Sequence, residues 1–130
     1  MANRYYKDPV EKNLKTLRRG KSRSYGITVT DEDGNPINVS GDKFYLTIKK
    51  SSRHTDAAAL LQNSYLAPND SGSEAGQARV QISAEDSLSL PVGTFVYDIT
   101  WVRLTSSPGD SVTVQTGKIS IEQGVTLAIT

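Results

Sequence analysis

Short segments in which apolar and polar residues alternate recur along this chain, and they limit the folds open to it. The clearest covers residues 94–104, where large apolar side chains occupy every second position: Phe95, Tyr97, Ile99 and Trp101. Shorter segments with the same period contain Tyr25, Ile27 and Val29; Phe44, Leu46 and Ile48; Ala78, Val80 and Ile82; and Val112, Val114, Ile119 and Ile121. A period of two is that of a β-strand with one face in a core and the other in water.

Turn-forming residues separate these segments. The strongest turn signal is Asp31-Glu32-Asp33-Gly34-Asn35-Pro36, because glycine tolerates a positive φ and proline fixes its own φ. Pro108-Gly109-Asp110 predicts a hairpin loop, and Ser83-Ala84-Glu85-Asp86 predicts one helical turn capped by its serine. Seven or eight short strands at near-regular spacing predict an all-β fold, an antiparallel β-sandwich.

Between the strands the pattern is less definite. Residues 57–62 fit either a helical turn or a short edge strand, and residues 69–73 have the composition of a flexible loop. In the segment that contains Phe44, we expect Tyr45, Thr47 and Lys49 to face solvent.

The chain has 130 residues, a usual length for one domain. We expect an extended basic arm at residues 1–12, the sandwich at 13–123, and a short C-terminal strand or tail at 124–130. Pro9 argues against a helix in the arm. Because there is no cysteine, the fold must be stabilised by packing, by backbone pairing or by contacts with partner subunits.

Charge is unevenly distributed along the chain. Residues 1–30 contain eight basic and two acidic residues (8 − 2 = +6), and the remainder contains seven basic and twelve acidic residues (7 − 12 = −5). A basic arm on an acidic body predicts attraction between copies, or to an acidic partner surface. We expect residues 1–12 to lie along another subunit. The candidate partner-binding residues are Arg4, Tyr5, Tyr6, Lys7, Arg18 and Arg19.

Two locations and one partner class are disfavoured. No apolar run approaches the roughly 20 residues that span a bilayer, and the N-terminus lacks the apolar stretch of a secretory signal. We therefore expect no membrane insertion, with assembly in a host cytoplasm. The basic arm has the charge and aromatic content of a protein that binds single-stranded nucleic acid, but the acidic body disfavours that function.

The sequence offers little metal-binding or catalytic chemistry. The single histidine, His54, lies in a polar stretch that suits a catalytic base poorly, and one histidine without cysteine excludes the usual zinc ligand sets. An acidic turn has part of the spacing of a calcium-binding loop, but Pro36 stands where such a loop needs glycine, so a plain turn is favoured. The residues that would be its ligands are Asp31, Asp33, Asn35 and Asp42.

Sugar chemistry is the other alternative. Asp86, Asp98 and Asp110 are carboxylates from which a glycosidase pair could be drawn, although the sequence gives no distance between them. Trp101 and the tyrosines could stack on a sugar, but the period-two pattern places Trp101 in the core. We expect neither an enzyme nor a bound cofactor.

The order of several motifs resembles a known group of phage proteins. The motifs are residues 14–22 (LKTLRRGKS), 31–41 (DEDGNPINVSG), 44–50 (FYLTIKK), 90–99 (LPVGTFVYDI) and 117–121 (GKISI). Their succession, which spans about residues 13–123, resembles the immunoglobulin-like N-terminal domains of tailed-phage baseplate upper proteins and related tail or fibre attachment modules.

The resemblance implies an immunoglobulin-like sandwich that works as a virion structural protein. Such a domain attaches a fibre, spike or adaptor to the tail or baseplate, usually within a ring or trimer, so its partners would be other virion proteins and further copies of itself. No helical stalk or receptor-binding head follows the sandwich, which favours a stand-alone adaptor. The alternatives are a capsid decoration (cement) protein and a carbohydrate- or receptor-binding module.

Overall fold

The computed structural model describes residues 10–31, 33–50, 59–103 and 111–123. This part of the chain is mostly β, with eight strands and two short helices. The elements in order are β1 (Val10–Glu11), β2 (Leu17–Arg18), β3 (Arg23–Thr28), β4 (Lys43–Lys49), β5 (Leu61–Leu66), α1 (Ser71–Glu74), β6 (Gln77–Ile82), α2 (Ala84–Leu88), β7 (Gly93–Val102) and β8 (Ser111–Glu122).

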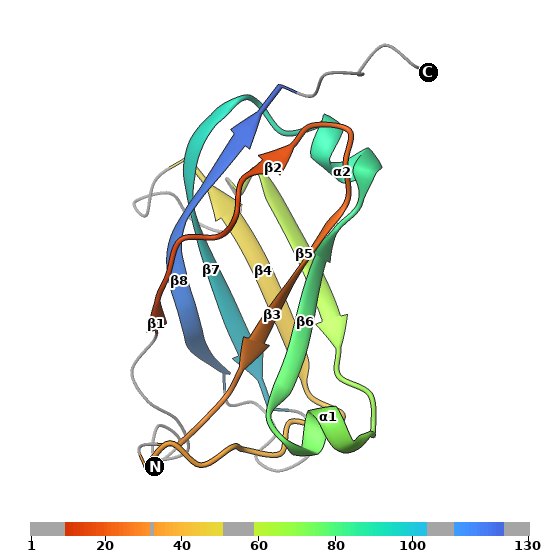
Figure 1. Cartoon of the computed structure of the whole chain (residues 1–130), viewed down its shortest axis with the longest axis vertical. Helices are drawn as coiled ribbons and strands as arrows, with labels where there is room; N and C mark the ends of the chain where they lie inside the picture. Colours follow the sequence, from red (N-terminus) through yellow and green to blue (C-terminus); the bar gives the residue numbers. More distant parts are fainter. Residues whose placement is uncertain (1–9, 32, 51–58, 104–110, 124–130) are drawn as a thin grey trace.

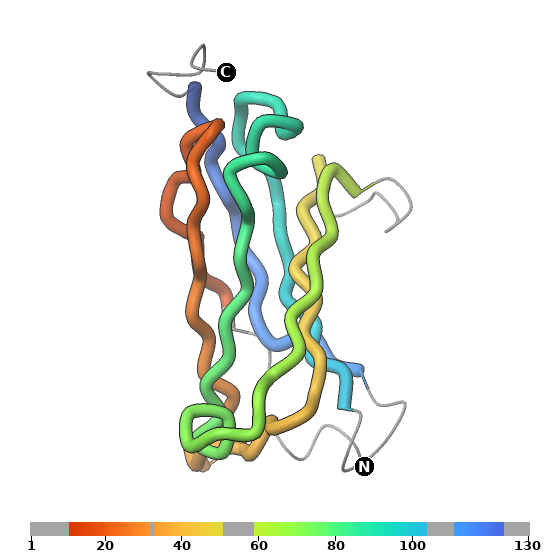
Figure 2. The backbone as a smooth tube through the Cα atoms, turned by 90° about the vertical axis from the view of Figure 1, so that its right-hand side faces the viewer, coloured from red at the N-terminus to blue at the C-terminus, as the bar shows by residue number. Residues whose placement is uncertain are grey.

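The strands form one large and one small sheet (Figure 1). The large sheet has the order β1-β8-β7-β4-β5, with β2 also paired to β8, and the small sheet consists of β3 and β6. In Figure 1, β3 and β6 lie in front of β4 as a second layer, and in the view turned by 90° they lie to the left of β4 and β5 (Figure 2). The two layers are in contact where β5 lies beside β6. There the Asn63 amide Nδ2 donates a hydrogen bond to the Gln81 carbonyl over 3.0 Å.

The predicted all-antiparallel arrangement is wrong for the first two strands. β1 and β2 both pair with β8 in parallel, so the large sheet is mixed. The physical reason lies in residues 10–19, which we call the leading segment. This segment runs beside β8 in the same direction, and its Leu17 side chain is buried in the core. The other strand pairs in both sheets are antiparallel, as the short turn-separated segments predict.

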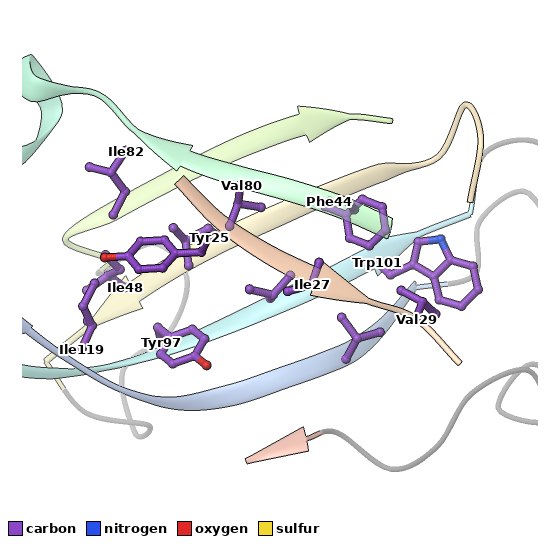
Figure 3. Close-up of a cluster of buried hydrophobic side chains, with 14 of the residues drawn as sticks. Tyr25, Ile27, Val29, Phe44, Ile48, Val80, Ile82, Tyr97, Trp101 and Ile119 are labelled. Atoms are coloured by element: carbon purple, nitrogen blue, oxygen red, sulfur yellow. The ribbon is translucent and has the colours of Figure 1, made fainter. Parts of the chain in front are cut away.

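The core lies between the two layers, and the alternating residues form it. Figure 3 shows Tyr25 and Ile27 from β3 pointing toward the side chains of the large sheet. The largest fully buried side chains, Phe44, Tyr97 and Trp101, come from β4 and β7, whose alternation is the clearest in the sequence. A fully buried Phe, Val or Leu side chain contributes about 1.5–3 kcal/mol relative to an exposed one. Period-two patterning therefore identified the core correctly.

Two local predictions are confirmed by hydrogen bonds. In the acidic turn, Asp31 N donates to Asn35 O over 2.8 Å, and Gly34 has a φ of 87°. At α2, the Ser83 hydroxyl accepts a bond from Asp86 N over 3.0 Å, which is the predicted N-cap. Such a cap satisfies one of the amides that a helix start leaves free.

Two others differ from the structure. Residues 71–74 form α1 rather than a loop, because the Asp70 carboxylate accepts from Ser73 N over 2.9 Å and caps the turn. Thr47 does point away from the core, but it is only 3% exposed, since Gln62 Nε2 donates to its hydroxyl over 3.0 Å. Leu61 and Gln62 belong to the residues whose pattern fits either a helical turn or a short edge strand, and in the structure they begin the edge strand β5.

Candidate interaction surfaces

The leading segment follows β8 closely but with one change of register. Val10 stands opposite Gln115, an offset of 105 residues, whereas Leu17 stands opposite Ile121, an offset of 104. One extra residue of the leading segment is therefore accommodated between them. The bonds from Lys12 N to Thr116 O and from Leu14 N to Lys118 O keep the first register, so the extra residue lies between Leu14 and Leu17. Just before this bulge, the Asn13 side-chain oxygen accepts a bond from Lys118 N over 3.1 Å, so a side chain supplies the acceptor for an amide of β8.

Two tyrosines of the core form hydrogen bonds to backbone carbonyls of this bulged region. The Tyr97 hydroxyl donates to Lys12 O and accepts a bond of 2.8 Å from Gln115 Nε2, and the Tyr25 hydroxyl donates to Lys15 O over 3.1 Å. Burial raises the pKa of Tyr25 to about 12 and also raises the pKa of Tyr97. Both phenols therefore remain protonated donors at neutral pH, and they fix the leading segment to the core.

A glycine in β8 allows the segment to come this close. Gly117 lies opposite Tyr97, and a Cβ atom on it would meet Lys12 O at 2.2 Å. Its φ of 157° is also unfavourable for other residues. The sequence pattern indicates no role for Gly117. In the structure, β8 continues through it, and the glycine provides the space for the leading segment.

The structure places only two of the six predicted partner-binding residues. Arg4, Tyr5, Tyr6 and Lys7 lie outside the described residues. Arg18 is exposed, at 3.9 Å from the Glu122 carboxylate. Arg19 is used within the domain, since its guanidinium donates to Leu88 O over 2.7 Å and to Gln123 Oε1 over 3.2 Å.

The leading segment also changes the extent of the predicted arm. Residues 10–12 pair with β8 of their own domain, although they were expected to lie along another subunit. Exposed basic side chains nevertheless continue along the leading segment and on to the start of β3: Lys12, Lys15, Arg18, Lys21 and Arg23. The predicted basic surface is therefore partly a strand at the edge of the domain.

A polar hollow of about 610 Å³ lies on the outer face of the large sheet. Its floor consists of neighbouring residues across the strands, because Thr116, Asp98 and Thr47 stand in register on β8, β7 and β4. The next row contains Lys118, Val96 and Lys49. The sequence pattern identified these positions as outward-facing but gave no sign that they form a concave surface, since that depends on the leading segment closing one side with Glu11, Lys12 and Asn13.

A buried polar cluster lies elsewhere, beside the core. Asp42 and Trp101 are both fully buried, and the Trp101 indole Nε1 donates to the Asp42 carboxylate over 3.0 Å. The Arg103 guanidinium lies over the same indole ring at 4.9 Å from its centroid, a cation–π contact. Trp101 is therefore a packing residue, as predicted, and cannot serve as an exposed platform for sugars.

The candidate metal ligands do not converge in the described part of the chain. The Asp31 carboxylate accepts bonds from Asp33 N and Asn35 N, and Asp42 is engaged with Trp101. Residues 10–31, 33–50, 59–103 and 111–123 contain no group of three acidic or histidine side chains that could hold a metal ion. His54 and Asp110 lie outside these ranges. None of the helices among them is long and apolar enough to cross a membrane.

Comparison with known proteins gives a likeness in fold. No family model matches the chain, and no curated protein matches it in sequence. Among solved structures, the fold is similar to the N-terminal domain of phage TP901-1 ORF48, with a TM-score of 0.51 and 13% identity. The likeness covers 89% of this chain and 99% of that domain, so it concerns the whole fold. At this identity it establishes the fold alone.

Proposed function

We propose that the chain is a structural subunit of a phage virion, an immunoglobulin-like assembly or adaptor domain of the tail, baseplate or fibre-attachment region. The observation that carries the proposal is the fold shared with a phage protein domain over nearly the full length of both. The ordered motifs of the sequence support the same class independently. The domain would act by binding other virion proteins and not by catalysis.

The surface chemistry fits a protein partner better than a small ligand. The hollow combines three lysines, Lys12, Lys49 and Lys118, with the carboxylates of Glu11 and Asp98. Small-molecule sites are mostly apolar with a few polar groups, whereas most of the residues that line this hollow are polar or charged, the exceptions being Val96, Tyr97 and Gly117. Mixed charge of this kind gives orientation and specificity to a protein interface.

The test is whether purified particles contain the chain, and where. Gradient-purified phage particles from the source of this sequence are analysed by quantitative mass spectrometry, and separated heads and tails are then analysed individually. A low copy number confined to the tail fraction is expected. A high copy number on heads would assign the chain to capsid decoration instead, and its absence from particles would refute a virion role.

A glycan-array screen of the isolated protein tests the remaining alternative, carbohydrate or receptor binding. The proposal expects no selective glycan. This screen does not depend on particle purification, so a virion subunit that also binds a receptor is recognised as such.

A further inference from the structure

β3 is hydrogen-bonded on one side only. It pairs with β6, and Val29 N donates to Gly76 O over 2.8 Å in the same register as that ladder. Because bonded and non-bonded pairs alternate along antiparallel strands, the backbone groups of Tyr25 and Ile27 point toward β6. Those of Ser24, Gly26 and Thr28 point to the opposite side, where the described part of the chain provides no strand partner.

Nothing in the described chain blocks this edge at its centre. The side chains of Ser24 and Thr28 are small and exposed, and a Cβ atom on Gly26 would have no neighbouring atom within 4 Å. Natural proteins protect exposed edges with lysine, proline, bulges or a covering element. On β3, only Arg23, at the very start of the strand, is of that kind.

The other edges of the described fold are protected. The leading segment, which ends the large sheet on one side, is bulged and carries exposed Lys12 and Lys15. At the opposite side, β5 passes β6, where Asn63 bonds to the Gln81 carbonyl. The contrast makes β3 the edge at which a further strand can be added with the least rearrangement.

We propose that the open edge of β3 accepts residues 125–130 of a second copy of this chain as an added strand. This inference rests on the proposed assembly function and specifies how copies join. The segment reads Val-Thr-Leu-Ala-Ile-Thr, so its large apolar side chains, Val125, Leu127 and Ile129, occupy every second position and are separated by small residues, the period of a strand with one apolar face. An added strand gains main-chain hydrogen bonds, and its alternate side chains give specificity.

Charge distinguishes this segment from the other terminal segment of the chain. Exposed Lys21 and Arg23 lie before and at the start of β3, and exposed Arg79 stands opposite Gly26 on β6, so the small sheet disfavours a basic strand. Residues 1–9 include Arg4 and Lys7, whereas residues 125–130 contain no charged side chain. The C-terminal segment is therefore the better occupant.

Geometry favours a second copy over the chain's own segment. β8 is described up to Gln123, and β2 lies against its end, with Arg18 opposite Glu122. In Figure 1 the leading segment, with β2, lies between the end of β8 and β3, so a strand that continued from β8 to its own β3 would have to pass the leading segment. Donor and acceptor surfaces differ, so repeated contacts of this type build a ring or an open filament.

The test blocks each half of the contact in the full-length chain. Gly26→Pro removes an amide that points away from β6 and leaves the β6 ladder intact, which is the setting in which proline is tolerated in a strand. Gly26→Ala keeps that amide and is the matched control. Leu127→Pro blocks the donor, with Leu127→Ala as its control. Self-association is measured by analytical ultracentrifugation over a concentration series, with circular dichroism to confirm folding.

The native chain should associate with increasing concentration, and either proline variant should weaken this association at least about tenfold, which corresponds to about 1.4 kcal/mol. Each alanine control should retain association better than the proline variant at the same position. The Gly26→Pro variant keeps an intact segment 125–130, and the Leu127→Pro variant keeps an intact β3 edge. An equimolar mixture should therefore form a one-to-one dimer that grows no further. If Gly26→Pro does not fold, Leu127→Pro added to native chain should still terminate assembly.

Three results would overturn the inference: a native chain that stays monomeric at its highest soluble concentration, proline variants that associate like the native chain, or a mixture that forms no dimer. The native chain could also be monomeric while the Leu127→Pro variant loses hydrogen-exchange protection at the Gly26 amide. That result would show that the segment binds its own β3. Particle composition is measured separately, so the virion role can stand or fall independently of this contact.

Discussion

Gly117→Ala should detach the leading segment from β8 while the rest of the fold remains. The added methyl group would lie 2.2 Å from Lys12 O and 2.7 Å from the Lys12 carbonyl carbon, so the backbone of the segment must move. That movement breaks two hydrogen bonds, from Lys12 N to Thr116 O and from the Tyr97 hydroxyl to Lys12 O. The backbone pairing between β3 and β6 includes no residue of the leading segment and should remain.

The size of the effect follows from these contacts. Each hydrogen bond contributes about 1 kcal/mol to stability, and a non-glycine residue in an unfavourable φ region costs about 1–3 kcal/mol. Alanine also gives the unfolded chain less conformational freedom than glycine does, and this offsets about 0.4–1 kcal/mol of the loss. We therefore expect the free energy of unfolding to fall by about 3 kcal/mol, a large part of the total for a domain of this size.

Urea denaturation measures the loss, and hydrogen exchange locates it. The amides of Lys12 and Leu14, which bond to Thr116 O and Lys118 O, should lose protection first. Gly26→Ala is the matched control, because Gly26 has open space around it and no positive φ. It should leave stability unchanged or slightly higher. Equal stability of the two variants, with the Lys12 amide still protected, would show that the close approach at Gly117 is unimportant.

Three further variants or conditions test other contacts. Arg19→Ala removes two side-chain hydrogen bonds and should lower the free energy of unfolding, measured by urea denaturation, by about 1–2 kcal/mol. Arg18→Ala removes an exposed ion pair at 3.9 Å and should lower it by under about 0.5 kcal/mol. Equal losses in the two variants would contradict this assignment. Ser83→Ala removes the cap of α2 and should lower the free energy of unfolding by about 1 kcal/mol, with Ser83→Asp restoring it. Because burial raises the pKa of Tyr25 to about 12 and that of Tyr97 in the same direction, the folded state holds these protons more tightly. Stability should thus be constant up to about pH 10, the ordinary value for tyrosine, and then fall as pH rises toward the folded-state value. A pH series that shows no such fall in the native chain would exclude this linkage.

The strands of the core were predictable because burial on one face imposes a period of two. Phe44, Tyr97 and Trp101 stand out in the sequence for that reason, and all three are buried. The turn at Asp31 and the cap at Ser83 were predictable because both depend on side chains that bond to backbone amides within four residues.

The direction of the leading segment and the polar hollow were not predictable from local pattern. Residues 14–18 alternate only weakly, and a parallel partner about 105 residues away leaves no local signal. The outward position of Thr47 follows from its period, but its burial depends on Gln62 in another strand. Concavity and pairing direction arise from contacts between distant segments, which the pattern of a single strand does not contain.

The different protection of the two edges has a consequence for assembly. β8 has twelve residues and carries Val112, Val114, Ile119 and Ile121, so its uncovered edge would be a long and apolar template for nonspecific pairing. The leading segment covers that edge, and the edge left open is β3, which is half as long and polar on its outer side. Gly117→Ala should therefore increase irregular aggregation by exposing β8, whereas Gly26→Pro should reduce ordered association by closing β3. Light scattering and sedimentation of the two variants distinguish these effects, and if both shifted association in the same direction, the two edges could not have the separate roles assigned to them.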